Sequence, residues 1–199
     1  AAYRQGIFPW FSDGEPILWW SPDPRMVLDP AELKISRSLG KVLRNKSYEV
    51  RFDTAFEQVI AACAAPRDKQ AATWITTAMQ AAYCKLHQLG HAHSAETWID
   101  GQLAGGLYGV AVGDVFFGES MFTRVRDASK IALASAVRIL VQQEFKLIDC
   151  QFHTDHLESL GAKLVPRSDF LRQVRKLVHN SRSVGHWSHA GFVNQPCHN

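Results

Sequence analysis

Hydrophobic and polar positions follow two different periods along the chain, and the change of period predicts which segments are strands and which are helices. Alternation with a period of two predicts a strand, whereas apolar positions three and four residues apart predict a helix. Strands are expected at 48–52, 92–99, 102–112, 115–122, 146–151 and 162–165. Helices are expected at 30–45, 54–65, 76–89, 127–143, 155–160 and 168–178, with Asp127 as the N-cap of the fourth.

Short turns join three of these strands. Asp100-Gly101 and Gly113-Asp114 have the composition of two-residue hairpin turns, so 92–122 should form an antiparallel meander. A meander followed by helix, strand, helix and strand is the order of the acetyltransferase-like (N-acyltransferase) fold, an α+β fold. In that fold the two central strands, here 115–122 and 146–151, splay apart, and the acyl group is transferred in the gap between them.

The two ends of the chain differ from this middle part. Residues 1–25 are rich in aromatic side chains and contain three breaks at proline, which exclude a long helix. Residues 180–199 are polar and contain few apolar anchors, so we expect them to be loosely held.

Composition restricts the class of protein only loosely. The chain has 199 residues, of which 46% are hydrophobic and 21% charged, enough to bury a core. The net charge of +3 permits an anionic partner without demanding one. Four scattered cysteines fit reduced thiols in a cytoplasm better than a disulfide framework. The sequence contains neither a membrane-spanning apolar run nor a recognisable signal peptide.

Polar side chains on the two central strands are the candidate reaction site. Glu119 lies among aromatic and apolar residues, where a charged group is costly to keep unless it is used. Alternation places Asp149 and Gln151 on one face of their strand and Cys150 on the other. Asp149, Gln151 and Glu119 should therefore converge in the gap.

Long residue strings extend this interpretation. They read YRQGIFPWFSDGEPILWWSPDPR near the start, TWIT at 73–76, AYCKLHQLGHAHSAETW at 82–98, GGLYGVAVGDVFFGESMF at 105–122 and LIDCQ at 147–151. Together they closely resemble the bacterial leucyl/phenylalanyl-tRNA–protein transferases, from about residue 1 to about residue 178. We could not match the tail that follows to that family.

The resemblance implies an aminoacyltransferase of the cytoplasm that moves Leu or Phe, and less readily Met, from aminoacyl-tRNA onto proteins with an N-terminal Arg or Lys, marking them for degradation by the N-end rule. It implies a monomer with no metal and no organic cofactor. We expect residues 1–25 to be the remnant of a small N-terminal α+β domain, and 26–199 to be the catalytic domain.

The resemblance also implies roles for individual residues. Trp10 and Trp74 would stack on either side of the terminal adenine of the tRNA. Phosphates of the tRNA would contact one basic helix face, and the Leu or Phe side chain of the donor would enter an apolar pocket. The basic face comprises Lys34, Arg37, Lys41 and Arg44, and the pocket comprises Leu107, Phe116, Met121 and Phe152.

In the expected reaction the α-amine of the acceptor attacks the aminoacyl ester directly. The Gln151 carbonyl oxygen would hold the amine, while Asp149 polarises that amide or accepts the proton. Glu119 would attract the cationic acceptor or orient the adenosine ribose. His153 and His156 follow Cys150, but we favour neither a thiol nucleophile nor a zinc site there. His91 and His93 indicate no particular chemistry.

Two other classes are considered: an acyl-CoA-dependent N-acetyltransferase and a non-catalytic RNA-binding module. Acyl-CoA enzymes of this fold hold the pyrophosphate on a glycine-containing loop, whereas residues 124–129 read RVRDAS and place an acid there. The set of Glu119, Asp149 and Gln151 argues against a module without catalysis.

Overall fold

The computed structural model describes residues 1–12, 14–66, 74–180, 185–187 and 192–194. It is built on one mixed sheet of eight strands, in the order β10-β4-β5-β6-β7-β8-β3-β9. In that order the strands are Phe192–Asn194, Tyr48–Phe52, Ala92–Ile99, Gln102–Val112, Val115–Thr123, Leu147–Gln151, Arg25–Leu28 and Lys163–Val165. This arrangement confirms an α+β, acyltransferase-like fold.

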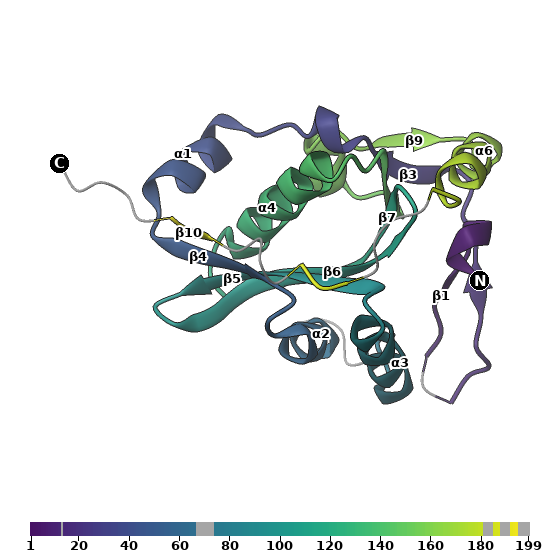
Figure 1. Ribbon diagram of the computed structural model, residues 1–199, viewed down its shortest axis with the longest axis horizontal. Coiled ribbons are helices and arrows are strands. Elements are labelled where there is room, and N and C mark those ends of the chain that lie inside the picture. The colour runs from purple at the N-terminus through teal and green to yellow at the C-terminus, as the bar shows by residue number, and fades with distance from the viewer. Residues whose placement is uncertain (13, 67–73, 181–184, 188–191, 195–199) are drawn as a thin grey trace.

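Helices cover both faces of the sheet (Figure 1). The helices α2 (Phe56–Ala64), α3 (Thr77–Gln88) and α6 (Arg167–Leu177) contribute to one apolar cluster. Helix α4 (Ala128–Gln142) is the centre of a second cluster on the opposite face, beside α1 (Arg37–Asn45). A short helix, α5 (Asp155–Ser159), links β8 to β9.

The predicted meander is confirmed. Strands β5, β6 and β7 pair antiparallel, and both residues of the Asp100-Gly101 turn have positive φ, as a tight hairpin turn requires. Strands β7 and β8 are parallel and pair over Val115–Phe117 and Leu147–Asp149, after which they diverge. The predicted gap between the central strands is therefore present.

One expected element is wrong, and the structure adds detail at two others. The single helix expected at 30–45 is a 3₁₀ turn, η2 (Pro30–Glu32), and a separate helix, α1, because Ser36 caps a new helix by accepting a hydrogen bond from Leu39 N–H. Asp127 is the N-cap residue of α4, as expected, although its backbone is left-handed and its side chain makes no capping hydrogen bond. The described part of the C-terminal tail is docked, because β10 pairs with β4.

The N-terminal segment lies beside the right-hand end of the sheet in Figure 1. It consists of the 3₁₀ turn η1 (Tyr3–Gln5) and a small hairpin of β1 (Phe8–Pro9) and β2 (Trp19–Trp20). The next strand, β3, enters the main sheet between β8 and β9. No helix among the described residues combines the length and apolar character that crossing a membrane requires.

Candidate active site

A β-bulge aims Glu119 at the point where β7 and β8 diverge. Tyr108 pairs with Ser120 and Gly109 with Gly118, so Glu119 is the extra residue of the bulge. A side chain on Gly109 would not fit, since a Cβ there would lie 2.4 Å from the Phe117 carbonyl oxygen. Bulges of this kind redirect one side chain without ending the strand. The bulge therefore depends on a glycine in the neighbouring strand.

Three donors surround the buried Glu119 carboxylate. The hydroxyl groups of Tyr3 and Tyr83 donate to it at 2.8 and 2.7 Å, and Gln151 Nε2 donates at 3.3 Å. Burial raises the pKa of Glu119 to about 7. The two tyrosine hydrogen bonds oppose this rise in pKa, and the nearby charge of Asp149 adds to it. A carboxyl group with such a pKa can exchange a proton near neutral pH.

Asp149 belongs to a buried ion pair. Arg25 donates from Nε and Nη2 to its two carboxylate oxygens at 2.7 and 2.6 Å, and both side chains are fully buried. Asp149 Oδ1 also accepts the backbone N–H of Gln151 at 2.9 Å. Asp149 thus contacts the Gln151 backbone, and not the side-chain amide that the sequence led us to expect. This contact supports the left-handed backbone of Gln151, whose φ is +64°.

Cys150 lies on the other side of β8, as alternation predicts. It packs against the apolar cluster around α4. Burial raises the pKa of the Cys150 thiol far above its usual range, so the sulfur stays protonated. His153 is exposed and pairs with Glu158. The geometry therefore gives no support to a thiol nucleophile activated by histidine.

Trp10 and Trp74 come together although 63 residues separate them in the sequence. Their rings stack with centroids 5.5 Å apart, and Phe152 packs edge-on against Trp10 at 4.9 Å. The expected sandwich around an adenine requires these two rings to separate by one more stacking distance. Trp10 is 38% exposed, so its outer surface is open to a partner.

Three of the four expected pocket residues, all except Phe152, lie on the side of the sheet that packs against α4. Leu107 and Phe116 are buried in the cluster around α4, and Met121 packs against it, whereas Phe152 joins the tryptophan pair. The structure does not bring these four side chains into one group. Their role in holding the donor side chain stays a prediction.

The basic face lies on α1. Arg37, Lys41 and Arg44 are exposed and line a shallow hollow on this helix, whereas Lys34 precedes the helix and does not line that hollow. The role of these four residues in binding phosphate likewise stays a prediction.

The loop before α4 is unsuited to a pyrophosphate. The backbone N–H groups of Arg124 and Val125 are already bonded to the Ala104 carbonyl oxygen. Asp127 places a carboxylate at the start of the helix and pairs with Lys130. Free N–H groups and an uncompensated helix terminus are what a phosphate needs.

Sequence reasoning missed two features of the site. Tyr3 and Tyr83 are the hydroxyl partners of Glu119, and they come from η1 and α3. Arg25 is the partner of Asp149. Each was part of a string that carried the resemblance, but nothing local in the sequence distinguishes a tyrosine or an arginine that will point inward.

Comparison with known proteins points to the same family that the residue strings resemble. Residues 27–175 match the family described as leucyl/phenylalanyl-tRNA protein transferase, and residues 1–23 match its N-terminal domain. The leucyl/phenylalanyl-tRNA–protein transferase of Chromobacterium violaceum is 60% identical over 94% of this chain and 81% of its own length. Its counterpart in Nitrosomonas europaea is 63% identical over 89% of this chain and 75% of its own length.

Proposed function

Since the chain belongs to the leucyl/phenylalanyl-tRNA–protein transferase family, we propose that it transfers Leu or Phe from aminoacyl-tRNA to the N-terminal α-amine of proteins. The acceptors are proteins that begin with Arg or Lys, and the enzyme acts as a monomer in the cytoplasm. The observation that carries the proposal is the buried contact between Glu119 and Gln151 at the divergence of β7 and β8.

The amide of Gln151 positions the attacking amine. The amide nitrogen donates to Glu119, so the amide carbonyl oxygen of Gln151 points toward another partner. An ammonium or amine is a donor and fits such an oxygen. Gln151 therefore orients the nucleophile, and its own orientation is set by Glu119.

Glu119 is the better proton acceptor of the two carboxylates. An α-amine has a pKa of about 7.7–8.0, so part of the acceptor is protonated at neutral pH and must lose a proton. The pKa of Glu119, about 7, is close to that value. Asp149 is paired with Arg25 on both oxygens, and it serves to hold the backbone of Gln151.

The test is a transfer assay with leucyl-tRNA and a peptide that begins with Arg. Leucine should appear on the α-amine of the peptide. A peptide with an acetylated N-terminus, and acetyl-CoA in place of leucyl-tRNA, should give no product. Transfer from acetyl-CoA instead would support the acyl-CoA class, and tRNA binding without any transfer would support the non-catalytic module.

A second test concerns the tryptophan pair. Trp10→Ala and Trp74→Ala should each raise the KM for leucyl-tRNA by roughly 5- to 150-fold, because base stacking contributes about 1–3 kcal/mol. The kcat should change less, since the adenine does not react. Trp98→Ala is the control, because its ring packs under Arg51. Normal donor kinetics with lowered thermal stability would contradict the stacking role.

A further inference from the structure

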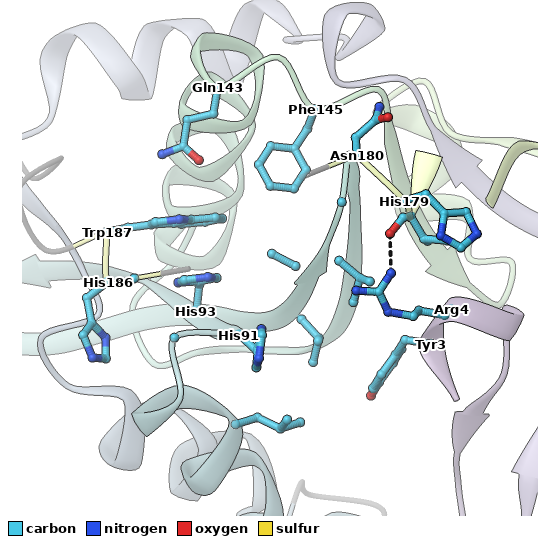
Figure 2. A pocket seen from close by; sticks show the side chains of 18 of the residues that line it. Tyr3, Arg4, His91, His93, Gln143, Phe145, His179, Asn180, His186 and Trp187 are labelled. Carbon is cyan, nitrogen blue, oxygen red and sulfur yellow. Dashed lines mark hydrogen bonds between the residues drawn. The ribbon is translucent and has the colours of Figure 1, made fainter. Parts of the chain in front are cut away.

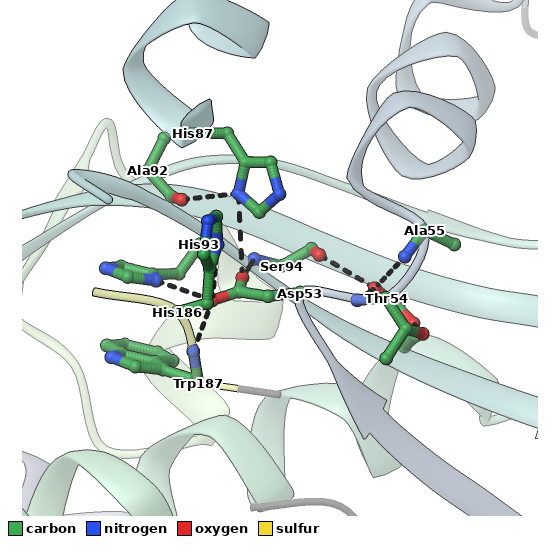
Figure 3. A network of polar contacts seen from close by, with 10 residues as sticks. Asp53, Thr54, Ala55, His87, Ala92, His93, Ser94, His186 and Trp187 are labelled. Carbon is green, nitrogen blue, oxygen red and sulfur yellow. Dashed lines mark hydrogen bonds and ion pairs between the residues drawn. The ribbon is translucent and has the colours of Figure 1, made fainter. Parts of the chain in front are cut away.

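A cluster of imidazoles surrounds one buried carboxylate outside the reaction site. Asp53 follows β4, and its side chain is fully buried. It accepts the backbone N–H groups of Ser94 at 2.8 Å and Trp187 at 2.6 Å, and His93 Nδ1 lies 2.8 Å from its Oδ2 (Figure 3). A carboxylate that receives three N–H donors on its two oxygens is ionised. The cluster therefore holds a fixed negative charge.

Two further imidazoles face this charge. His87, on α3, has Nδ1 3.8 Å from Asp53 Oδ1, and His186, in the C-terminal tail, has Nδ1 3.9 Å from Asp53 Oδ2. One nitrogen or oxygen from each of the three residues lies within 4.8 Å of the others. These distances are too long for hydrogen bonds, so each of the two imidazole nitrogens faces the carboxylate without bonding to it.

Residues 185–187 of the tail are held by contacts that involve no ligand. The ring of Trp187 stacks on that of His93 (Figure 2), and their centroids are 4.0 Å apart. The backbone N–H of Trp187 bonds to Asp53, and residues 192–194 pair with β4 as β10. Contacts made by the residues next to it therefore place His186 beside the Asp53 carboxylate.

Two imidazole nitrogens and a carboxylate oxygen are ligands that suit a transition metal of intermediate softness, such as Zn²⁺. Zn²⁺ binds imidazole nitrogen and carboxylate oxygen at about 2.0–2.2 Å, which places tetrahedral ligands roughly 3.3 Å apart. The two histidine–carboxylate separations of 3.8 and 3.9 Å reach different oxygens of Asp53, and each exceeds this spacing by about half an ångström. The three ligand atoms all lie within 4.8 Å of one another and must draw together around the ion. His186 is 45% exposed and can make that movement. Two imidazoles and one carboxylate leave a fourth position for water.

The surroundings of the three residues also fit a metal. His93 bonds the carboxylate from outside the triad, as partners of metal-bound carboxylates commonly do. Of the three proposed ligands, His186 lines a cavity of about 880 Å³, together with His93, so its side of the cluster opens on that cavity (Figure 2). His87 Nδ1 donates its proton to the Ala92 carbonyl oxygen at 2.9 Å. Metal binding replaces that proton, because a ligand nitrogen must be deprotonated.

We infer that Asp53, His87 and His186 form a structural binding site for a divalent transition metal such as Zn²⁺, which fastens the C-terminal tail to α3 and the end of β4. None of the three belongs to the Glu119–Gln151 site, so the inference is independent of the proposed transfer reaction.

Calorimetric titration of the untagged full chain with zinc chloride tests the inference. We expect one tight zinc site per chain, and we expect His186→Ala to bind zinc at least about tenfold more weakly than the unmodified chain. His186→Ala should remain folded, because the side chain is partly exposed. Zinc should also raise the Tm of the unmodified protein and leave that of His186→Ala unchanged. Magnesium, which prefers oxygen ligands, should have no such effect.

Two matched variants separate this site from other histidines. His91→Ala removes an exposed imidazole from the same cavity, and His153→Ala removes one from the exposed group of His153, Asp155 and Glu158. Both should bind zinc like the unmodified chain. Zinc binding that survives His186→Ala, that is lost in His153→Ala, or that is no tighter than magnesium binding would overturn the inference.

Discussion

At the scale of the residue, the environment of Glu119 links the stability of the protein to pH. Its carboxyl group is protonated more readily in the folded protein, with a pKa of about 7, than in the unfolded chain, where the reference value is 4.5. The folded state therefore binds more protons between these two values. The stabilisation is fully present below pH 4.5 and is lost as the pH rises through 7.

Replacement of Glu119 by Gln should remove this contribution. Relative to Glu119→Gln, the unmodified protein should lose at most about 3 kcal/mol of unfolding free energy between pH 4.5 and 8. Urea unfolding of both proteins across this range measures the difference. Identical pH dependence in the two proteins would show that Glu119 titrates normally.

The kinetic roles of neighbouring residues on β8 should differ sharply. Gln151→Ala should lower kcat by about 10²-fold or more while tRNA affinity stays the same, because in our scheme the reacting amine is the part of the substrates that Gln151 contacts. Cys150→Ala should stay active, since the thiol packs against the α4 cluster and remains protonated. An inactive but folded Cys150→Ala would instead support a covalent thiol intermediate.

At the scale of the element, helix α1 carries the expected phosphate contacts. Simultaneous replacement of Arg37, Lys41 and Arg44 by Ala should weaken tRNA binding and make it less sensitive to salt. The plot of log K against log salt should become less steep by about 2–3, because a complex with fewer phosphate contacts releases fewer counterions when it forms. The kcat at saturating tRNA should be unchanged.

A matched control is available on α6. Arg172, Arg175 and Lys176 are also exposed on one helix, so their joint replacement removes the same charge from a different surface. Filter binding at several salt concentrations compares the two triple variants. Equal slopes for both would mean that α1 is an ordinary solvated surface.

At the scale of the whole molecule, the buried pair of Arg25 and Asp149 joins the first strand after the N-terminal segment to the centre of the sheet. The Arg25 guanidinium also lies over the rings of Phe8 and Phe170, at 4.7 and 4.4 Å, so it links β1 and α6 as well. Removal of one partner leaves a buried charge without compensation.

We therefore expect Arg25→Met to lower the free energy of unfolding by about 3–5 kcal/mol. The double variant Arg25→Met/Asp149→Leu should cost less than the sum of the two single variants, since neither charge then remains alone. Urea unfolding of the four proteins completes the cycle. Strictly additive costs would show that the two charges do not interact. Loss of activity in Asp149→Asn should accordingly be interpreted only alongside its stability.

The sequence was sufficient for features that depend on local pattern. Period-two alternation and the Asp100-Gly101 turn predicted the meander, and alternation along β8 placed Cys150 away from the site. Local pattern failed where contacts distant in sequence decide. In the described part of the tail, for example, Trp187 stacks on His93, a contact between distant residues that no local pattern indicates.

By itself the sequence determined the fold class, the family and the convergence of Glu119 with Gln151, because strand periodicity and long specific strings are properties of neighbouring residues. Only the tertiary structure decided which groups hold those side chains. Tyr3 and Tyr83 meet Glu119 from segments 80 residues apart, and Arg25 crosses 124 residues to reach Asp149. The imidazoles around Asp53 likewise come from distant segments with no recognisable spacing. Such pairings result from sheet order and helix packing, which bring together residues that no local rule connects.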